Sequence, residues 1–230
     1  MKKVLILFIL LQAFNTHANL ESKVPPTIAG ITIPNTHMLA DNGSVYRGMA
    51  PKHRIQELIN LGITDVLIFK NQTLREVDNE ITALTEAGYR FENIHHIPFK
   101  WRDVKDLRVA CQQTVQALQL IREVYLSQNR AIFFHCTVGE DRTGLLAGMW
   151  EILTTGKRTQ TIFQKQMCER GYAAGNSHKP YFVVSAIRRN LTPLFFKMVR
   201  LVERGYLSFD NLDPASCGKM EWVKTIPRCN

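Results

Sequence analysis

The sequence has few cysteines and no long apolar run, and both absences restrict the class of protein. Its 5 cysteines in 230 residues are too few for a small domain built on disulfides, and they lack the paired CxxC spacing of a zinc module. No stretch approaches the roughly 18 apolar residues of a membrane-spanning helix, so we expect no transmembrane anchor. Acidic residues are also scarce, with 20 Asp and Glu against 29 Lys and Arg and a net charge of +9. This excess indicates an anionic partner, without choosing among nucleic acid, a membrane surface and a phosphorylated small molecule.

The first 18 residues have the pattern of a secretory signal peptide. Lys2 and Lys3 form a short positive start, and residues 4–11 are all aliphatic or aromatic. Thr16-His17-Ala18 is a small-residue cleavage site, so we expect cleavage after Ala18 and export to a periplasm or beyond. The alternative is a buried N-terminal strand or helix. Loss of the two lysines would leave a net charge of +7, in a compartment that permits disulfides.

Residues 19–230 alternate between strand and helix patterns, which predicts one α/β sandwich. The expected strands are 45–47, 64–69, 91–97 and 131–134, and the expected helices are 54–61, 74–87, 104–126, 143–153, 162–170, 181–189 and 194–203. The apolar run 131–134 is typical of a central strand that is covered on both faces of a parallel sheet. No repeat or linker divides the chain. We therefore expect a single domain with a mostly parallel central sheet flanked by helices, a core at about 40–205 and a tail at 206–230.

The candidate chemistry follows the central strand. The string there is His135-Cys136-Thr137-Val138-Gly139-Glu140-Asp141-Arg142-Thr143-Gly144. His-Cys, five residues and then Arg-Thr-Gly, between a buried strand and a helix start, resembles the loop of the cysteine-based protein tyrosine and dual-specificity phosphatases. The order of strand, loop and helix extends this resemblance to about residues 40–190. It implies a dual-specificity-phosphatase-like fold and a phosphocysteine mechanism that needs no metal or cofactor.

The spacing of the motif has a physical reason. A loop of this length can turn successive backbone N–H groups of Thr137, Val138, Gly139 and Glu140 toward one phosphoryl group, and the following helix adds its positive end. The same field lowers the pKa of Cys136, so that a thiolate is available to attack phosphorus. Gly139 permits a positive φ and a close approach of the backbone.

Three further side chains of the motif have expected roles. Arg142 can hold two phosphate oxygens in a bidentate fork, which Lys could not do equally well. The family resemblance implies that Thr143 hydrogen-bonds the sulfur and assists breakdown of the phosphocysteine. It also implies that His135 braces the loop from beneath. There are two alternatives. The first is a buried structural cysteine that has an arginine nearby by chance. The second is a sulfurtransferase loop, but such a loop does not require Arg-Thr-Gly at this spacing.

A thiolate nucleophile needs a separate acid to protonate the leaving oxygen. The resemblance implies an aspartate on a loop before a long helix, and Asp103 in Trp101-Arg102-Asp103 is 33 residues before Cys136. Arg102 stands where the tyrosine phosphatases have proline. Asp103 could also simply cap the helix. Asp141 is the alternative acid, because some bacterial members use an aspartate directly before the loop arginine.

The charges around the motif give conflicting indications of the substrate. Family members that act on inositides often carry Lys where this chain has Glu140, and a glutamate facing the pocket would repel a second phosphate. In contrast, Arg102 lies in a basic segment, and residues 171–202 contain five Lys or Arg, including Lys179, and no carboxylate. We therefore expect a multiply phosphorylated small molecule such as the inositol polyphosphates cleaved by the phytases of this superfamily. A phosphoprotein is the alternative substrate, and nucleic acid is not expected.

The remaining cysteines concern the compartment. Cys217 and Cys229 are close in the C-terminal tail, and we predict a disulfide between them, whereas Cys111 and Cys168 are expected to be small core residues. We expect no metal site, since His95 and His96 are adjacent on a strand and point to opposite faces. The last alternative for the whole chain is a non-catalytic phosphate-binding module, which would be expected to lack Cys136, Arg142, Thr143 or the acid.

Overall fold

A computed structural model of the chain describes residues 21–99, 106–172, 181–223 and 225–229. Three sequence predictions therefore lie outside the described residues: the signal peptide, the candidate acid Asp103 with Arg102, and Lys179. Among the residues described, no helix is both long and apolar enough to span a bilayer.

The centre of the molecule is a five-stranded sheet with the order β1-β2-β5-β3-β4. The strands are β1 (His37–Met38), β2 (Val45–Met49), β3 (Asp65–Ile68), β4 (Ile94–His96) and β5 (Ile132–Cys136). β1 pairs with β2 in antiparallel orientation, and all the other pairs are parallel. The predicted α/β fold with a mostly parallel sheet is confirmed. β1 was not predicted from the sequence, because two residues are too few to show a periodicity.

β5 lies between β2 and β3, and every one of its residues is buried. Its side chains alternate between two hydrophobic cores, as the twofold period of a strand requires. Phe133 packs in the core on the side of the sheet that carries α2 and α3, whereas Ile132 and Phe134 pack in the core on the opposite side. In register, Met49 of β2 lies beside Cys136, so the carboxyl ends of these strands meet at one edge of the sheet.

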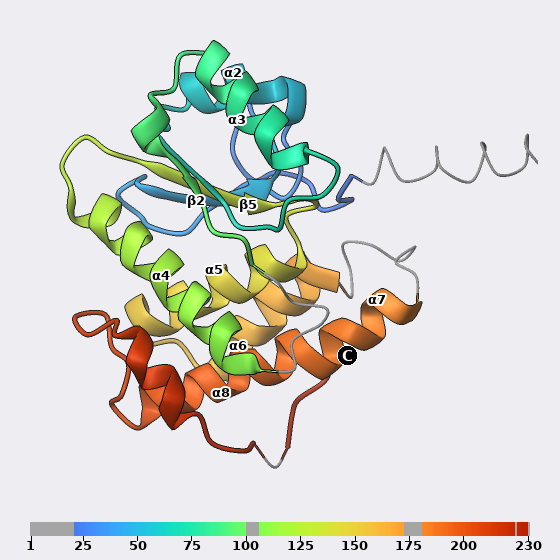
Figure 1. Cartoon of the computed structure of the whole chain (residues 1–230), viewed down its shortest axis with the longest axis vertical. Helices are drawn as coiled ribbons and strands as arrows, with labels where there is room; N and C mark the ends of the chain where they lie inside the picture. Colours follow the sequence, from blue (N-terminus) through green and yellow to red (C-terminus); the bar gives the residue numbers. More distant parts are fainter. Residues whose placement is uncertain (1–20, 100–105, 173–180, 224, 230) are drawn as a thin grey trace, which may run out of the picture.

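Helices cover both faces of the sheet (Figure 1). One face carries α2 (Ile55–Asn60) and α3 (Glu76–Glu86), and the other carries α4 (Leu107–Leu126), α5 (Asp141–Thr154), α6 (Thr159–Phe163) and α8 (Thr192–Glu203). α5 follows β5 directly, and residues 143–151 are all buried. A helix that is enclosed on all sides in this way is predominantly apolar, and it fixes the end of the loop that precedes it.

Three predicted helices differ in form from the structure. Residues 162–170 are divided between α6 and the π-helical segment η4 (Gln164–Tyr172). The separate helices expected at 181–189 and 194–203 join through a second π-helical segment, η5 (Ile187–Leu191), which connects α7 (Tyr181–Ala186) to α8. Pro193 has no N–H to donate and its ring crowds the carbonyl of the preceding turn, so the helix widens instead of ending.

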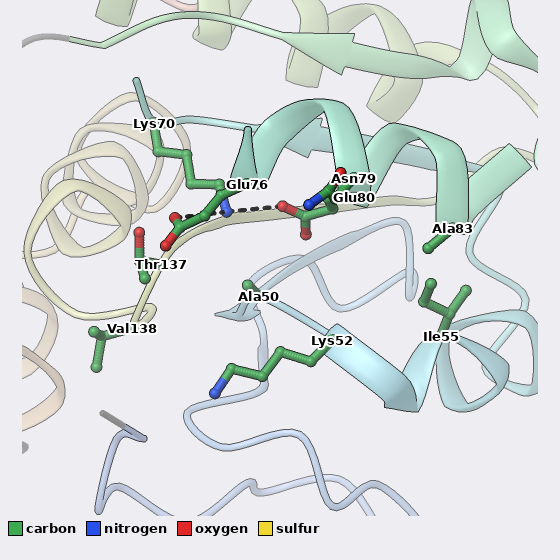
Figure 2. Close-up of a pocket in the computed structure, with 10 residues that line it drawn as sticks. All are labelled: Ala50, Lys52, Ile55, Lys70, Glu76, Asn79, Glu80, Ala83, Thr137 and Val138. Atoms are coloured by element: carbon green, nitrogen blue, oxygen red, sulfur yellow. Dashed lines mark ion pairs between the residues drawn. The ribbon is translucent and has the colours of Figure 1, made fainter. Parts of the chain in front are cut away.

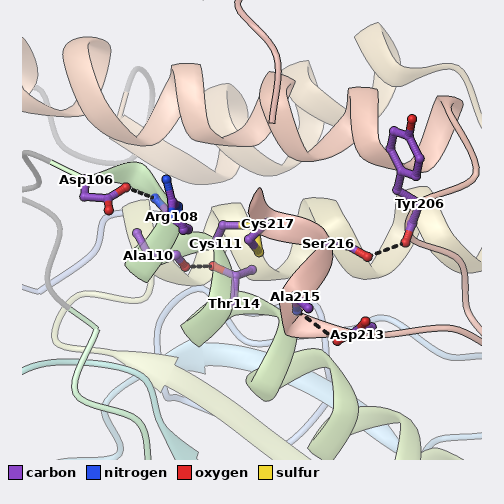
Figure 3. Close-up of a disulfide and its surroundings, with 10 residues drawn as sticks. All are labelled: Asp106, Arg108, Ala110, Cys111, Thr114, Tyr206, Asp213, Ala215, Ser216 and Cys217. Carbon is purple, nitrogen blue, oxygen red and sulfur yellow. Dashed lines mark hydrogen bonds between the residues drawn. A yellow bond between two sulfur atoms is a disulfide. The ribbon is translucent and has the colours of Figure 1, made fainter. Parts of the chain in front are cut away.

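The predicted disulfide between Cys217 and Cys229 is wrong in its pairing. Cys217 is bonded to Cys111 of α4 (Figure 3), and Cys229 is bonded to Cys168 of η4. The prediction of Cys111 and Cys168 as unpaired core residues is therefore also wrong. The short spacing of the two tail cysteines suggested a local bridge, but the tail packs back across the helical layer through the 3-10 helix η6 (Pro214–Lys219). Cys136 is the free cysteine.

Candidate active site

The candidate site lies where β5 passes into α5. The strand ends at Cys136, the loop spans residues 137–140, and α5 begins at Asp141. The N-terminal N–H groups of α5 have no partner within the helix and carry partial positive charge, which suits an anion. The predicted geometry of strand, loop and helix N-terminus is confirmed.

The environment of Cys136 favours a thiolate. Burial raises the pKa of this thiol, but the Arg142 guanidinium and a hydrogen bond from the Thr143 hydroxyl lower it more, so the net shift is downward. The backbone N–H of Cys136 also donates to Thr143 Oγ1 at 2.8 Å. The predicted contact between Thr143 and the sulfur is therefore present, and Cys136 has the surroundings of a nucleophile.

Arg142 is held over the loop by its own motif. Its Nη2 donates to Thr137 Oγ1 at 3.3 Å, and its side chain is partly buried. The guanidinium lies close enough to Cys136 to act on the thiol electrostatically. Both properties are those expected of a group that binds the phosphoryl oxygens and stabilises the charge developed during transfer.

Gly139 is required by the backbone of the loop. It has a φ of +73°, and a Cβ atom at this position would collide with the carbonyl group of Gly48 in β2. Only glycine combines that dihedral angle with that approach. The positive φ and the close backbone approach that were predicted for Gly139 are both present.

His135 braces the loop from within the sheet. Its ring is completely buried, and Nδ1 lies 3.1 Å from the Cys136 carbonyl oxygen. Nε2 lies 3.2 Å from Glu80 Oε1 of α3. Burial is the largest influence on His135 and lowers its pKa, although the Glu80 carboxylate opposes the shift. This arrangement agrees with the bracing role that the family resemblance implies.

The structure shows the direction of the Glu140 side chain, which the sequence left open. Glu140 is completely buried, and its Oε1 accepts a hydrogen bond from Ser22 Oγ at 2.7 Å. Its carboxylate therefore points into the protein. Sequence reasoning could not foresee this, because Ser22 is 118 residues away along the chain.

A cavity of about 420 Å³ adjoins the loop at Thr137 and Val138 (Figure 2). Its remaining lining consists of Ala50, Lys52, Ile55, Lys70, Glu76, Asn79, Glu80 and Ala83. Lys70 is almost fully buried there, with its Nζ 2.8 Å from Glu80 Oε2 and 3.9 Å from Glu76 Oε2. Apart from Thr137 and Val138, the residues that line the cavity were not predicted from the sequence. Lys52 and Lys70 follow β2 and β3, the two parallel strands that flank β5, and this place was a usable signal, because ligands bind at the carboxyl edge of a parallel sheet.

The candidate acids differ in what the structure shows. Asp103 lies outside the described residues. Asp141 is the first residue of α5, and its carboxylate opposes the decrease in the pKa of Cys136, so it lies within electrostatic reach of the sulfur. In the described part of the chain, no three His, Cys, Asp or Glu side chains converge as metal ligands.

Together these groups can perform phosphoryl transfer. The Cys136 thiolate would attack phosphorus and form an S–P bond while the bond to the leaving oxygen breaks and an acid supplies its proton. Water would then hydrolyse the phosphocysteine and restore the thiolate. The fold and the site define a cysteine-dependent phosphatase that needs no metal.

The comparison with protein families agrees with the site. The model of the tyrosine phosphatase family matches residues 42–165, which include β2 to β5, the loop and α5. The match covers more than half of the chain, and the chain belongs to the tyrosine phosphatase family.

Solved structures of low sequence identity are also similar. P. aeruginosa TpbA has 18% identity and a TM-score of 0.49, over 80% of this chain and 99% of that chain. Cydia pomonella PTP-2 has 13% identity and a TM-score of 0.47, over 67% of this chain and 88% of that chain. Human DUSP28 has 14% identity and a TM-score of 0.40, over 72% of this chain and 95% of that chain. No curated protein matches the sequence.

Proposed function

We propose that this phosphatase is exported and hydrolyses inositol polyphosphates through a phosphocysteine on Cys136. The observation that carries the substrate class is the burial of Glu140. A carboxylate that faced the pocket would repel every phosphate beyond the one being transferred. Because this carboxylate is buried against Ser22, it does not face the pocket and would not repel the further phosphates of a polyphosphate.

The cavity beside the loop supports the same substrate class. Its volume of about 420 Å³ falls in the range of about 300–1,000 Å³ that is usual for small-molecule sites. The Lys52 side chain extends along the pocket toward the loop (Figure 2). Its ion pair with Glu21 is 3.6 Å long and partly exposed, and such pairs are weak enough for a phosphate to replace the carboxylate. Lys70, in contrast, is balanced by Glu76 and Glu80.

A phosphotyrosine side chain is the second candidate, and one observation favours it. Ala50, Ile55, Ala83 and Val138 give part of the cavity an apolar wall, which could pack against an aromatic ring. The two candidates differ in charge, and this difference can be measured.

The test compares kcat/KM for inositol hexakisphosphate, a phosphotyrosine peptide and a phosphoserine peptide at physiological salt. We expect inositol hexakisphosphate to have the highest value and its KM to rise steeply with salt, because the Debye length is only about 10 Å at about 0.1 M. Lys52→Ala should raise the KM for the polyphosphate several-fold, whereas Lys157→Ala, at an exposed position after α5, should leave it unchanged. A higher kcat/KM for the phosphotyrosine peptide would reject the polyphosphate in favour of the second candidate.

Export is supported by the disulfides. The chain pairs Cys111 with Cys217 and Cys168 with Cys229, and such bonds persist mainly in oxidising compartments. Fractionation of bacteria that express the full chain, with mass spectrometry of the N-terminus, tests this proposal. We expect a periplasmic or secreted protein that begins at Asn19. An uncleaved chain confined to the cytoplasm would contradict it.

A further inference from the structure

The carbonyl oxygen of Gly139, in the middle of the phosphate-binding loop, has two buried hydrogen-bond donors. Asn35 Nδ2 donates to it at 2.8 Å, and Arg47 Nη2 donates to it at 2.5 Å. Both donor residues are fully buried, Asn35 before β1 and Arg47 in β2. The Gly139 carbonyl therefore points into the protein interior and away from the open side of the loop.

The same two donors connect the loop to η4. Asn35 Nδ2 also donates to the carbonyl of Arg170 at 2.7 Å, and Arg47 Nη2 reaches that carbonyl at 3.3 Å. Arg47 Nη1 donates to Gln166 Oε1 at 2.7 Å. Asn35 and Arg47 thus form a clamp, which holds the loop and η4 against the sheet.

The Asn35 amide can adopt only one orientation. His37 Nε2 lies 3.0 Å from Asn35 Oδ1, and His37 Nδ1 lies 3.0 Å from the Thr27 hydroxyl. Burial, followed by the charges of Arg170, Arg47 and Lys165, lowers the pKa of His37 to about 3, so the ring is neutral at physiological pH. A neutral ring that accepts from the Thr27 hydroxyl donates through Nε2 to Asn35 Oδ1. The Asn35 NH₂ group is then left for the two carbonyls.

The orientation of the Gly139 carbonyl decides what the loop offers to substrate. In a planar trans peptide the C=O of Gly139 and the N–H of Glu140 point in opposite directions. With the carbonyl held inward, the Glu140 N–H points toward the phosphate position. A flipped peptide would present an oxygen to the anion instead. Glycine at a φ of +73° permits such flips more readily than other residues, so this peptide needs an external constraint.

We propose that Asn35 and Arg47 are positioning residues for phosphoryl transfer, which hold the Gly139 peptide so that the Glu140 N–H binds the transferred phosphoryl group. The proposal rests on the phosphatase chemistry of Cys136, but neither residue belongs to the loop motif.

Arg47 contributes a charge as well as hydrogen bonds. Burial, followed by repulsion from Arg170, lowers the pKa of Arg47 to about 9, whereas the negative charges of Cys136 and Glu140 raise it. The guanidinium therefore remains protonated at neutral pH. It places a cation behind the loop, on the side opposite the substrate.

The test uses Asn35→Gly, because glycine accepts the left-handed φ of +58° at this position while it removes both donated hydrogen bonds. Asn129→Gly is the matched control, since Asn129 has a φ of +62° but is exposed in the turn before β5, at the opposite end of that strand from the loop. For both variants we would measure turnover of an aryl phosphate, inhibition by vanadate, the number of sites alkylated by iodoacetate and the melting temperature.

We expect Asn35→Gly to lower kcat/KM by about 10-fold to 100-fold, less than the roughly 10²–10³-fold loss when a direct oxyanion donor is removed. The inhibition constant for vanadate should rise by a similar factor, because vanadate occupies the same cradle of N–H groups. The control should match the wild type in both respects. A variant that has fewer alkylated sites but wild-type vanadate affinity at the remaining sites would overturn the proposal, because that is the signature of a purely structural defect.

Arg47→Lys provides a second, independent variant that keeps the charge but cannot serve Gly139, Gln166 and Arg170 together. It should also weaken vanadate binding at the sites that can still be alkylated, and wild-type affinity would contradict the proposal. Wild-type turnover of the aryl phosphate is measured in parallel. If the wild type is inactive, the phosphatase function fails; if it is active and both variants match it, only the role of the clamp fails.

Discussion

The phosphate-binding loop and the C-terminal tail are both fixed to the rest of the fold, but by different means. Buried hydrogen bonds from Asn35 and Arg47 hold the loop, whereas the disulfides of Cys217 and Cys229 hold the tail. Hydrogen bonds fix the direction of a peptide group, which the loop requires for its N–H groups to face an anion. A disulfide fixes only the position of a chain segment, and this suffices for a tail with little regular structure.

The disulfides that hold the tail also leave the nucleophile as a free thiol. Four of the five cysteines are paired, and Cys136 is the one that remains as a thiol. The two means of attachment meet in η4, where Cys168 bonds to the tail while Gln166 and Arg170 accept hydrogen bonds from Arg47. The comparison therefore predicts that changes in the loop affect chemistry more than stability, and that changes in the tail do the reverse.

The largest effect on activity is expected from loss of the general acid. Asp103→Asn should lower kcat by about 10²–10⁴-fold on substrates with poor leaving groups and much less on an aryl phosphate, whose leaving group needs little protonation. The measurement is the ratio of kcat for an alkyl and an aryl phosphate. If Asp141→Asn changes this ratio and Asp103→Asn does not, the acid is Asp141 at the start of α5.

The next largest effect on activity is expected at Arg142, whose guanidinium contacts the loop. Arg142→Lys keeps the charge but loses the planar fork that binds two oxygens, so we expect kcat/KM to fall by about 10²–10³-fold. The melting temperature should stay close to that of the wild type, because Arg142 donates only to Thr137 among the hydrogen bonds described for it. A large loss of stability would show that this arginine also holds the fold together.

The two disulfides should affect stability strongly and activity unequally. Paired Cys-to-Ser replacement at 168 and 229, or at 111 and 217, should each lower the free energy of unfolding by about 2–5 kcal/mol, since each bond closes a long loop. Denaturant unfolding measures this. Only the first pair touches η4, so we expect it to lower kcat/KM several-fold and the second pair to leave it unchanged. If the two paired replacements changed kcat/KM equally, the proposed connection between the tail and the loop through η4 would be wrong.

The smallest effect is expected for the thiol pKa. Thr143→Val removes the hydroxyl that, after Arg142, lowers the pKa of Cys136 against the effect of burial. The pKa should therefore rise, and less thiolate should exist at neutral pH. The rate of Cys136 alkylation by iodoacetate, measured against pH, should show its inflection at higher pH than in the wild type. An unchanged profile would exclude a role for the hydroxyl in stabilising the thiolate.

The sequence was informative where its signals were local. The run before Cys136 and the fixed spacing from His135 to Thr143 predicted β5, the loop, the helix start and the nucleophile, because each depends on residues that are adjacent in the chain. The clamp could not be found in this way. Asn35 and Gly139 are 104 residues apart, and a buried Arg47 in a short strand has no sequence pattern of its own.

Long-range pairing explains the errors as well. Cys111 and Cys217 are separated by 106 residues, so their bond depends on how the tail crosses α4, and local spacing favoured the wrong partner. The direction of the Glu140 side chain likewise could not be predicted from its neighbours in the loop. Its carboxylate accepts a buried hydrogen bond from Ser22, which is 118 residues away along the chain.

The most direct test of the account is to trap the phosphoenzyme. Wild-type protein and Cys136→Ser would be mixed with a ³²P-labelled aryl phosphate in the presence of a chelator, quenched with acid and digested for peptide mass spectrometry. We predict a labelled phosphocysteine at Cys136 in the wild type and no label or turnover in the variant, with the melting temperature preserved. Turnover that survives in Cys136→Ser, or a label on any other residue, would contradict it.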